Sequence, residues 1–227
     1  MALRRRAMAR GVGRSFLMQH MADELAERLS FVSRDFEAAL LIGPIADFAE
    51  HIVRNRALKI TSASMIDEEA LPYPPASFDL LLSAGTMDSV NDLPGALVQI
   101  RRCLKPDGLF LGTMFGAGSL SSLKSAMLKA DADRATSHIH PQIDLRTASD
   151  LVSRTGFALP VCDLDSLNVR YSNWRTLVSD LRDAGVGNAL AGPRDSASRG
   201  TIRRLDAIWQ EMANKEYRVT ETFNFLQ

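Results

Sequence analysis

The sequence predicts an α/β protein built on an open, mostly parallel sheet, and the stretch 73–115 carries most of the support for this fold class. Two apolar runs in this stretch, at 78–82 and 109–115, have the length of buried strands. Pro and Gly bound these runs, and a segment long enough for a helix separates them. Parallel strands buried on both faces read as continuous apolar runs, so this pattern indicates a βαβ unit.

The segment between the two strands has helical spacing. Leu93, Leu97 and Ile100 follow one another at steps of four and three residues, which places them on one face. Asp92 is suited to the N-cap, and Pro106 cannot continue the helix. We therefore expect one face of this helix to pack on the sheet.

Residues 15–30 also have the pattern of an amphipathic helix. Leu17, Met21, Leu25 and Leu29 are spaced by four, with charged residues between them. We expect a helix that covers the sheet, preceded by a solvated, arginine-rich arm without the apolar segment of a targeting peptide.

Short sequence words recur along the chain in a fixed order. They are LPY at 71–73 with SFDL at 77–80, VNDLPGAL at 90–97, LKPDG at 104–108, FGAGSL at 115–120 and RTGF at 154–157. Together they resemble class I methyltransferases that use S-adenosylmethionine (SAM). The resemblance is strongest to bacterial and mitochondrial proteins related to complex I assembly-factor methyltransferases, and to those of the biotin-synthesis type.

This resemblance, which covers about 16–225, implies a Rossmann-like, open twisted sheet with an antiparallel last strand and a helical cap insertion. We expect a single methyltransferase-like domain. Its parts are an arm and covering helix at 1–36, a Rossmann-like core at 37–165, a helical cap at 166–216 and a final strand at 217–227.

The turn after the first expected strand, 38–42, departs from the methyltransferase pattern. That pattern has an acidic residue, one spacer and Gly-x-Gly, because the backbone must approach the ligand without a Cβ in the way. Here Gly43 remains, but Leu41 takes the place of the acid and Ile45 that of the second glycine. We expect Ile45 to crowd a bound ligand.

The stretch from Gly43 to Asp67 is short for this fold. A crossover takes at least about 10 residues and a strand about 5, so one of each fills it. We expect the fold to be one strand or helix short between 47 and 67. Residues 60–64 also lack the carboxylate that usually holds a ribose. Asp67 or one of the two glutamates after it is an alternative partner.

Open α/β sheets bind ligands at the carboxyl ends of their strands. If SAM binds, the candidate cofactor residues are Gly43, Asp67, Ser83, Ala84 and Gly85. In the resemblance, Asp67 corresponds to a residue near the adenine.

The catalytic residue is open, with Asp88 and His138 as weak candidates. Asp88 could act as a base beside a methyl donor, or it could be a turn or cap residue. The resemblance places His138 in a loop that faces the substrate. His138 and His140, with Asp144 nearby, lack a further strong ligand at suitable spacing, so we expect no metal site.

The remaining elements follow from local patterns. The glycine-rich turn at 116–119 predicts a turn with Ser119 as the N-cap of a helix. Thr147 begins a capping-box pattern for the next helix. We expect a strand at 157–164 that 167–171 extends or follows. Amphipathic helices are expected at 174–185 and 201–213.

Composition narrows the classes of function. The formal net charge is zero and the sequence pI about 6.9, which gives no electrostatic case for nucleic acid. No run of eighteen apolar residues predicts a membrane span. Cys103 and Cys162 form no CxxC motif, which fits a reduced cytoplasm.

Two functions remain. One is methyl transfer from SAM to an unknown small-molecule or protein acceptor. The other is a non-catalytic, methyltransferase-fold binding or assembly factor that has lost SAM binding and acts with a protein partner.

Overall fold

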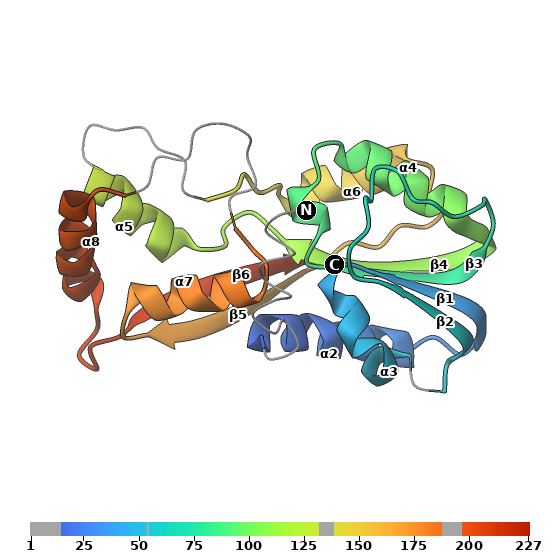
Figure 1. The fold of residues 1–227 in the computed structure, drawn as a ribbon, viewed down its shortest axis with the longest axis horizontal. Helices are drawn as coiled ribbons and strands as arrows, with labels where there is room; N and C mark the ends of the chain where they lie inside the picture. The colour runs from blue at the N-terminus through green and yellow to red at the C-terminus, as the bar shows by residue number, and fades with distance from the viewer. Residues whose placement is uncertain (1–14, 54, 132–138, 188–196) are drawn as a thin grey trace.

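The computed structural model describes residues 15–53, 55–131, 139–187 and 197–227, and these form a mixed sheet with helices around it (Figure 1). The sheet has six strands in the order β2-β1-β3-β4-β6-β5. Strands β1 to β4 run parallel, and β6 runs antiparallel to both β4 and β5. The expected open α/β sheet with an antiparallel last strand is confirmed. The strands are β1 (Phe36–Ile42), β2 (Ala57–Ala63), β3 (Phe78–Ala84), β4 (Leu104–Phe115), β5 (Leu164–Tyr171) and β6 (Val219–Leu226).

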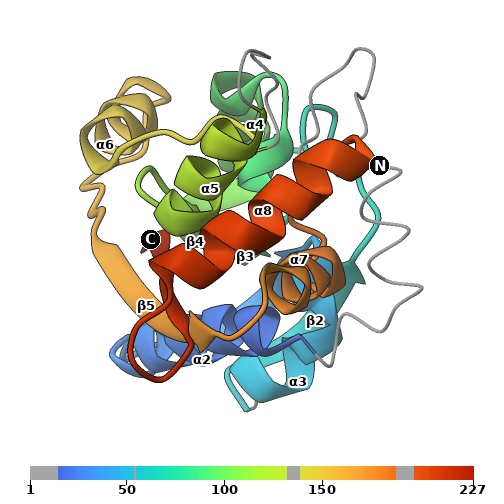
Figure 2. The same cartoon turned by 90° about the vertical axis from the view of Figure 1, so that its left-hand side faces the viewer.

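The helices divide among the two faces of the parallel strands and one end of the molecule. Figure 1 shows α2 and α3 on one face of β1 to β4, and α4 and α6 on the other. Figure 1 shows α5, α7 and α8 on the side of the molecule where β5 and β6 lie, and Figure 2 shows these three helices facing the viewer. The helices are α2 (Phe16–Ser30), α3 (Ala49–Ile52), α4 (Leu93–Cys103), α5 (Ser121–Asp131), α6 (Leu145–Arg154), α7 (Trp174–Asp183) and α8 (Arg199–Met212), with 3-10 turns η2 (Pro44–Phe48) and η3 (Met87–Ser89).

Strand β1 separates two apolar cores. Ala39 and Leu41 belong to the core under α2, whereas Leu40 and Ile42 belong to the core under α4. All four are fully buried, which is the reason why the strand reads as an uninterrupted apolar run. The expected cap is also present on α4, where the Asp92 side chain accepts a hydrogen bond from the Gly95 backbone N–H.

The connection after β1 is reduced, as the sequence predicted. The crossover consists of η2 and the four-residue helix α3, and β2 then forms the edge of the sheet. After β2 the chain reaches β3 without a further helix or strand in 64–77. Each residue of β2 is exposed or half-buried, and Leu58 is 90% exposed.

The prediction of a strand at 157–164 is wrong. Residues 157–163 form no regular strand, and β5 begins only at Leu164. Two backbone hydrogen bonds join Asp163 and Gln227 next to the ladder with β6, and no described strand pairs with 157–162. Leu159 has a φ of 51°, and Pro160 has no N–H to donate, so neither favours a ladder.

Two helix starts also differ from expectation. Helix α6 begins at Leu145 rather than near Thr147, and the Asp144 side chain caps it by accepting from the Thr147 N–H at 2.7 Å. Ser119 does not cap α5. Its hydroxyl donates to the backbone oxygens of Gly116 and Asn224, while the Glu221 carboxylate receives the N–H groups of the first turn of α5.

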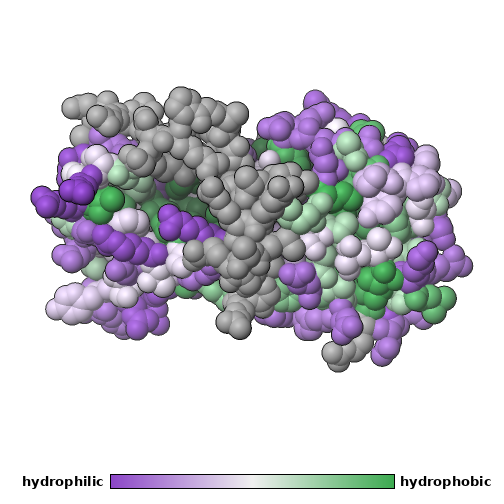
Figure 3. Space-filling view, in the orientation of Figure 1, coloured by the Kyte–Doolittle hydropathy of each residue, from purple (hydrophilic) through white to green (hydrophobic). Residues whose placement is uncertain are grey.

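Hydrophilic and hydrophobic residues are interspersed over the coloured parts of the face in Figure 3. Within the described residues, no helix combines the length and the apolar character that a bilayer crossing requires.

Candidate functional site

The candidate site is the end of the sheet where β1 and β3 finish. Ile42, the last residue of β1, pairs with Ser83 of β3, so Gly43 lies beside the end of β3. The structure thus brings together four of the sequence-predicted cofactor residues, Gly43, Ser83, Ala84 and Gly85. Gly43 and Gly85 both have positive φ, 85° and 70°, which a residue with a side chain rarely adopts.

Side chains of the protein cover both glycines. A Cβ on Gly43 would lie 2.3 Å from Cγ2 of Thr86, so this methyl group packs directly against the Gly43 backbone. A Cβ on Gly85 would lie 3.1 Å from Sδ of Met18, which comes from α2. Thr86 and Met18 therefore cover the side of these two glycines toward which a Cβ would point.

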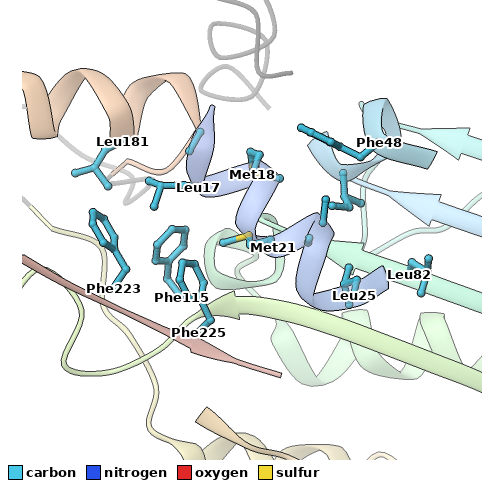
Figure 4. Close-up of a cluster of buried hydrophobic side chains, with 14 of the residues drawn as sticks. Leu17, Met18, Met21, Leu25, Phe48, Leu82, Phe115, Leu181, Phe223 and Phe225 are labelled. Carbon is cyan, nitrogen blue, oxygen red and sulfur yellow. The ribbon is translucent and has the colours of Figure 1, made fainter. Parts of the chain in front are cut away.

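Further apolar side chains of α2 pack near the same end of the sheet. Leu17, Met18, Met21 and Leu25 are fully buried, and Figure 4 shows Leu17 and Met21 directed toward the phenylalanine rings of the sheet. Ile45, in the place of the second glycine, is also fully buried in the same core. Long thioether side chains adapt to irregular spaces, which suits two methionines to this position.

The backbone groups at this end of the sheet are engaged within the protein. The Gly43 N–H donates to the Ala63 carbonyl at 3.1 Å, and the Gly85 N–H donates to that of Thr113 at 3.3 Å. The Ser83 and Thr86 hydroxyl oxygens lie 3.4 Å apart, and both residues are fully buried. These donors would have to break internal hydrogen bonds to hold a ligand.

The carboxylates of Asp67 and Glu69, after β2, accept hydrogen bonds from backbone N–H groups of nearby loop residues. Asp67 is exposed, and its carboxylate accepts from the Glu69 N–H at 3.1 Å. Glu69 accepts from the N–H groups of Asn91 and Asp92, which fixes the segment before α4. The alternative that Asp67, Glu68 or Glu69 replaces a ribose-binding carboxylate stays a prediction, and Glu68 is the buried member of the three, at 2% exposure.

These observations test whether the residues present fit SAM, the cofactor that the fold implies. Such a site needs an open glycine turn, backbone N–H donors and a carboxylate for the ribose. Here the turn is packed by Thr86 and Met18, and the Gly43 and Gly85 donors are paired. The residues do not fit SAM in this conformation. The cofactor role of Gly43, Asp67, Ser83, Ala84 and Gly85 thus stays a prediction.

The two catalytic candidates differ in what the structure says of them. Asp88 lies in η3, immediately after the buried loop that follows β3, and is half-buried. His138 lies outside the described residues. A catalytic role for either residue stays a prediction.

Three residues near the antiparallel strands β5 and β6 have perturbed pKa values. Burial, followed by the nearby Asp180 carboxylate, raises the pKa of the Tyr171 hydroxyl, and burial raises the pKa of Asp180 as well. Burial also raises the pKa of Glu221, against three backbone N–H bonds that lower it. Glu221 is the cap of α5, so we assign this residue a structural role.

Sequence reasoning missed a cluster formed by α2 and β5. His20 and Glu24 lie one turn apart on α2, and Asp165 is the second residue of β5. The His20 Nε2 and Asp165 Oδ2 atoms are 2.9 Å apart. Only the one-turn spacing of His20 and Glu24 was visible in the sequence, because Asp165 follows 145 positions after His20.

Comparison with known proteins supports the same architecture. Residues 10–112 match a family profile described as a methyltransferase domain. The chain is 33% identical over 222 residues to "Arginine-hydroxylase NDUFAF5, mitochondrial" of Danio rerio, covering 95% of this chain and 65% of the relative. It is 31% identical over 185 residues to "Malonyl-[acyl-carrier protein] O-methyltransferase 1" of Coxiella burnetii, covering 74% of this chain and 64% of that protein. The chain thus spans slightly less than two thirds of the length of these relatives.

A solved structure shows a similar fold. A crystal structure titled as a putative methyltransferase of Bacillus halodurans superposes with a TM-score of 0.55 at 12% identity, covering 90% of this chain and 95% of the other. At this identity the likeness concerns the fold alone.

Proposed function

We propose that the protein, whose residues 10–112 match a methyltransferase-domain profile, is a methyltransferase-fold binding or assembly factor that does not hold SAM. One observation carries this proposal. The thioether of Met18 and the methyl group of Thr86 pack on Gly85 and Gly43, the two glycines at which a cofactor would approach the backbone. The profile match and the fold support the scaffold but leave open what the scaffold does.

A protein partner is the second part of the proposal. The Coxiella relative is named for acting on a group attached to acyl-carrier protein, and the Danio relative is named as an arginine hydroxylase. We propose that this chain likewise meets its target on a protein. The identity of that partner follows from neither name.

Catalysis remains the second candidate function, because the family profile favours it. In this alternative SAM binds, and the chain transfers a methyl group to an unknown small-molecule or protein acceptor. Methyl transfer requires mainly that donor and acceptor be aligned and water be excluded. For SAM to enter, α2 would have to move Met18 away from Gly85.

Calorimetric titration of the full chain with SAM distinguishes the two. We expect no binding heat up to millimolar SAM, and S-adenosylhomocysteine should give the same result. Heat that saturates at micromolar SAM would overturn the proposal and favour the enzyme.

The variant Met18→Ala tests whether the Met18 side chain is what prevents SAM from binding. If the side chain of Met18 is what excludes the cofactor, this variant should bind SAM more tightly than the wild type does. Phe31→Ala is a matched control, because Phe31 follows the same helix and is 78% exposed. Equal behaviour of both variants would place the cause of exclusion elsewhere.

We also propose a cytoplasmic location. The described cysteines support it, because Cys103 and Cys162 are both free thiols, as a reducing compartment favours. The Danio relative is named as mitochondrial. Fractionation of the producing cells would show whether this chain is found in the cytoplasm.

A further inference from the structure

The polar face of α2 meets β5 in a group of three potential metal ligands. Among the residues that the structure describes, His20, Glu24 and Asp165 each offer one ligand atom, and these atoms all lie within 4.8 Å of one another. All three residues are half-buried. This group is separate from the filled cofactor end and does not depend on the function proposed above.

We propose that His20, Glu24 and Asp165 bind a divalent first-row transition metal ion. One imidazole and two carboxylates are hard-to-borderline donors of the kind that Zn²⁺, Mn²⁺, Fe²⁺ and Co²⁺ accept. Three protein ligands leave at least one position open for water or another ligand. The group therefore has the composition of an accessible metal site rather than of a closed structural one.

The distances are compatible with such an ion. Zinc bonds nitrogen and oxygen at about 2.0 to 2.2 Å, so two of its ligands lie roughly 3.0 to 3.6 Å apart. The His20 and Asp165 atoms, at 2.9 Å, are already near that separation. The flexible side chain of Glu24 can close the remaining gap by rotation about its χ angles.

The backbone positions of the three ligands are fixed without a metal. The Arg28 guanidinium, one turn beyond Glu24 on α2, binds both carboxylate oxygens of Asp163 at 2.9 and 3.0 Å. The His20 ring packs against the Phe225 ring with centroids 5.0 Å apart, and Phe225 pairs with Asp165 in the sheet. A site whose ligands are held in place loses less conformational entropy when the ion binds.

A simple ion pair between His20 and Asp165 is the competing interpretation, and it leaves Glu24 unexplained. Two carboxylates beside one imidazole carry more negative charge than the imidazole can balance, and like charges at short range repel. A divalent cation would balance both. The chain offers a natural contrast in His51 and Asp23, an exposed pair with 2.7 Å between Nε2 and Oδ1.

The test uses the full chain after treatment with a chelator. Titration with Co²⁺, followed by its visible absorption, should show one saturable site per chain, and calorimetry with Zn²⁺ should give the same stoichiometry. His20→Ala, Glu24→Gln and Asp165→Asn should each weaken binding at least about tenfold. His51→Ala, the matched control, should bind as the wild type does.

Two results would overturn the proposal. One is the absence of saturable Co²⁺ and Zn²⁺ binding up to millimolar concentration. The other is binding that the three ligand variants leave unchanged. Circular dichroism melts confirm that each variant is folded, and Glu24→Gln, which keeps the size of the side chain, serves if His20→Ala does not fold.

Discussion

Two neighbouring faces of α2 have opposite roles. The face formed by Leu17, Met18 and Met21 is fully buried and fills the end of the sheet where a methyltransferase would bind its cofactor. The next face, with His20, Glu24 and Arg28, meets the acidic start of β5. The same helix thus packs apolar atoms on one face and gathers polar ligand atoms on the next. The comparison teaches that one helix can pack an apolar face against the end of the sheet and hold polar ligand atoms in place on the next face.

The largest difference between the faces should appear in stability. Met21→Ala removes a fully buried side chain from the core, and such truncations destabilise by about 2 to 5 kcal/mol, because they lose burial and leave a cavity. Chemical denaturation of the wild type and the variant measures this change. Gln19→Ala, at an exposed position of the same helix, should change the free energy of unfolding by less than about 0.5 kcal/mol. Similar values for the two variants would mean that α2 is not packed as described.

A smaller effect is expected from Arg28→Ala. One Arg28 nitrogen, Nη2, contacts both carboxylate oxygens of Asp163, but the two side chains are 30% and 49% exposed, so loss of the pair should cost about 0.5 to 1 kcal/mol. A double-mutant cycle with Asp163→Ala isolates the pairwise energy, and high salt should reduce it. A coupling energy of zero would show that the Arg28–Asp163 pair does not help to hold α2 in place.

The smallest effect concerns Glu24 in the absence of metal. Glu24→Gln removes one of two neighbouring carboxylates, so the variant should be as stable as the wild type or slightly more stable, within about 0.5 kcal/mol. Adding Zn²⁺ should raise the melting temperature of the wild type and leave that of the variant nearly unchanged, because binding stabilises only the folded state. A clear loss of stability in metal-free Glu24→Gln would mean that Glu24 holds the fold through another contact.

Much of the fold could be predicted from the sequence because the patterns that indicate strands, helices and caps are local. The apolar runs of β1 and β3, the spacing in α2 and α4, and the Asp92 cap all depend on neighbours a few residues away. The altered turn after Gly43 could also be read directly, since Ile45 stands where a glycine was expected. The strand expected at 157–164 was misplaced because a strand also needs a partner, and β6 ends at Leu226.

The sequence by itself thus determined the layered α/β scaffold, its shortened crossover and the weakened glycine turn. Only the tertiary structure decided that Met18 lies on Gly85 and that Glu221 caps a helix that begins about a hundred positions earlier. It also brought Asp165 to His20 across 145 positions. The physical reason is that periodicity and capping act over one or two helical turns, whereas these contacts arise from the order and register of strands in the sheet.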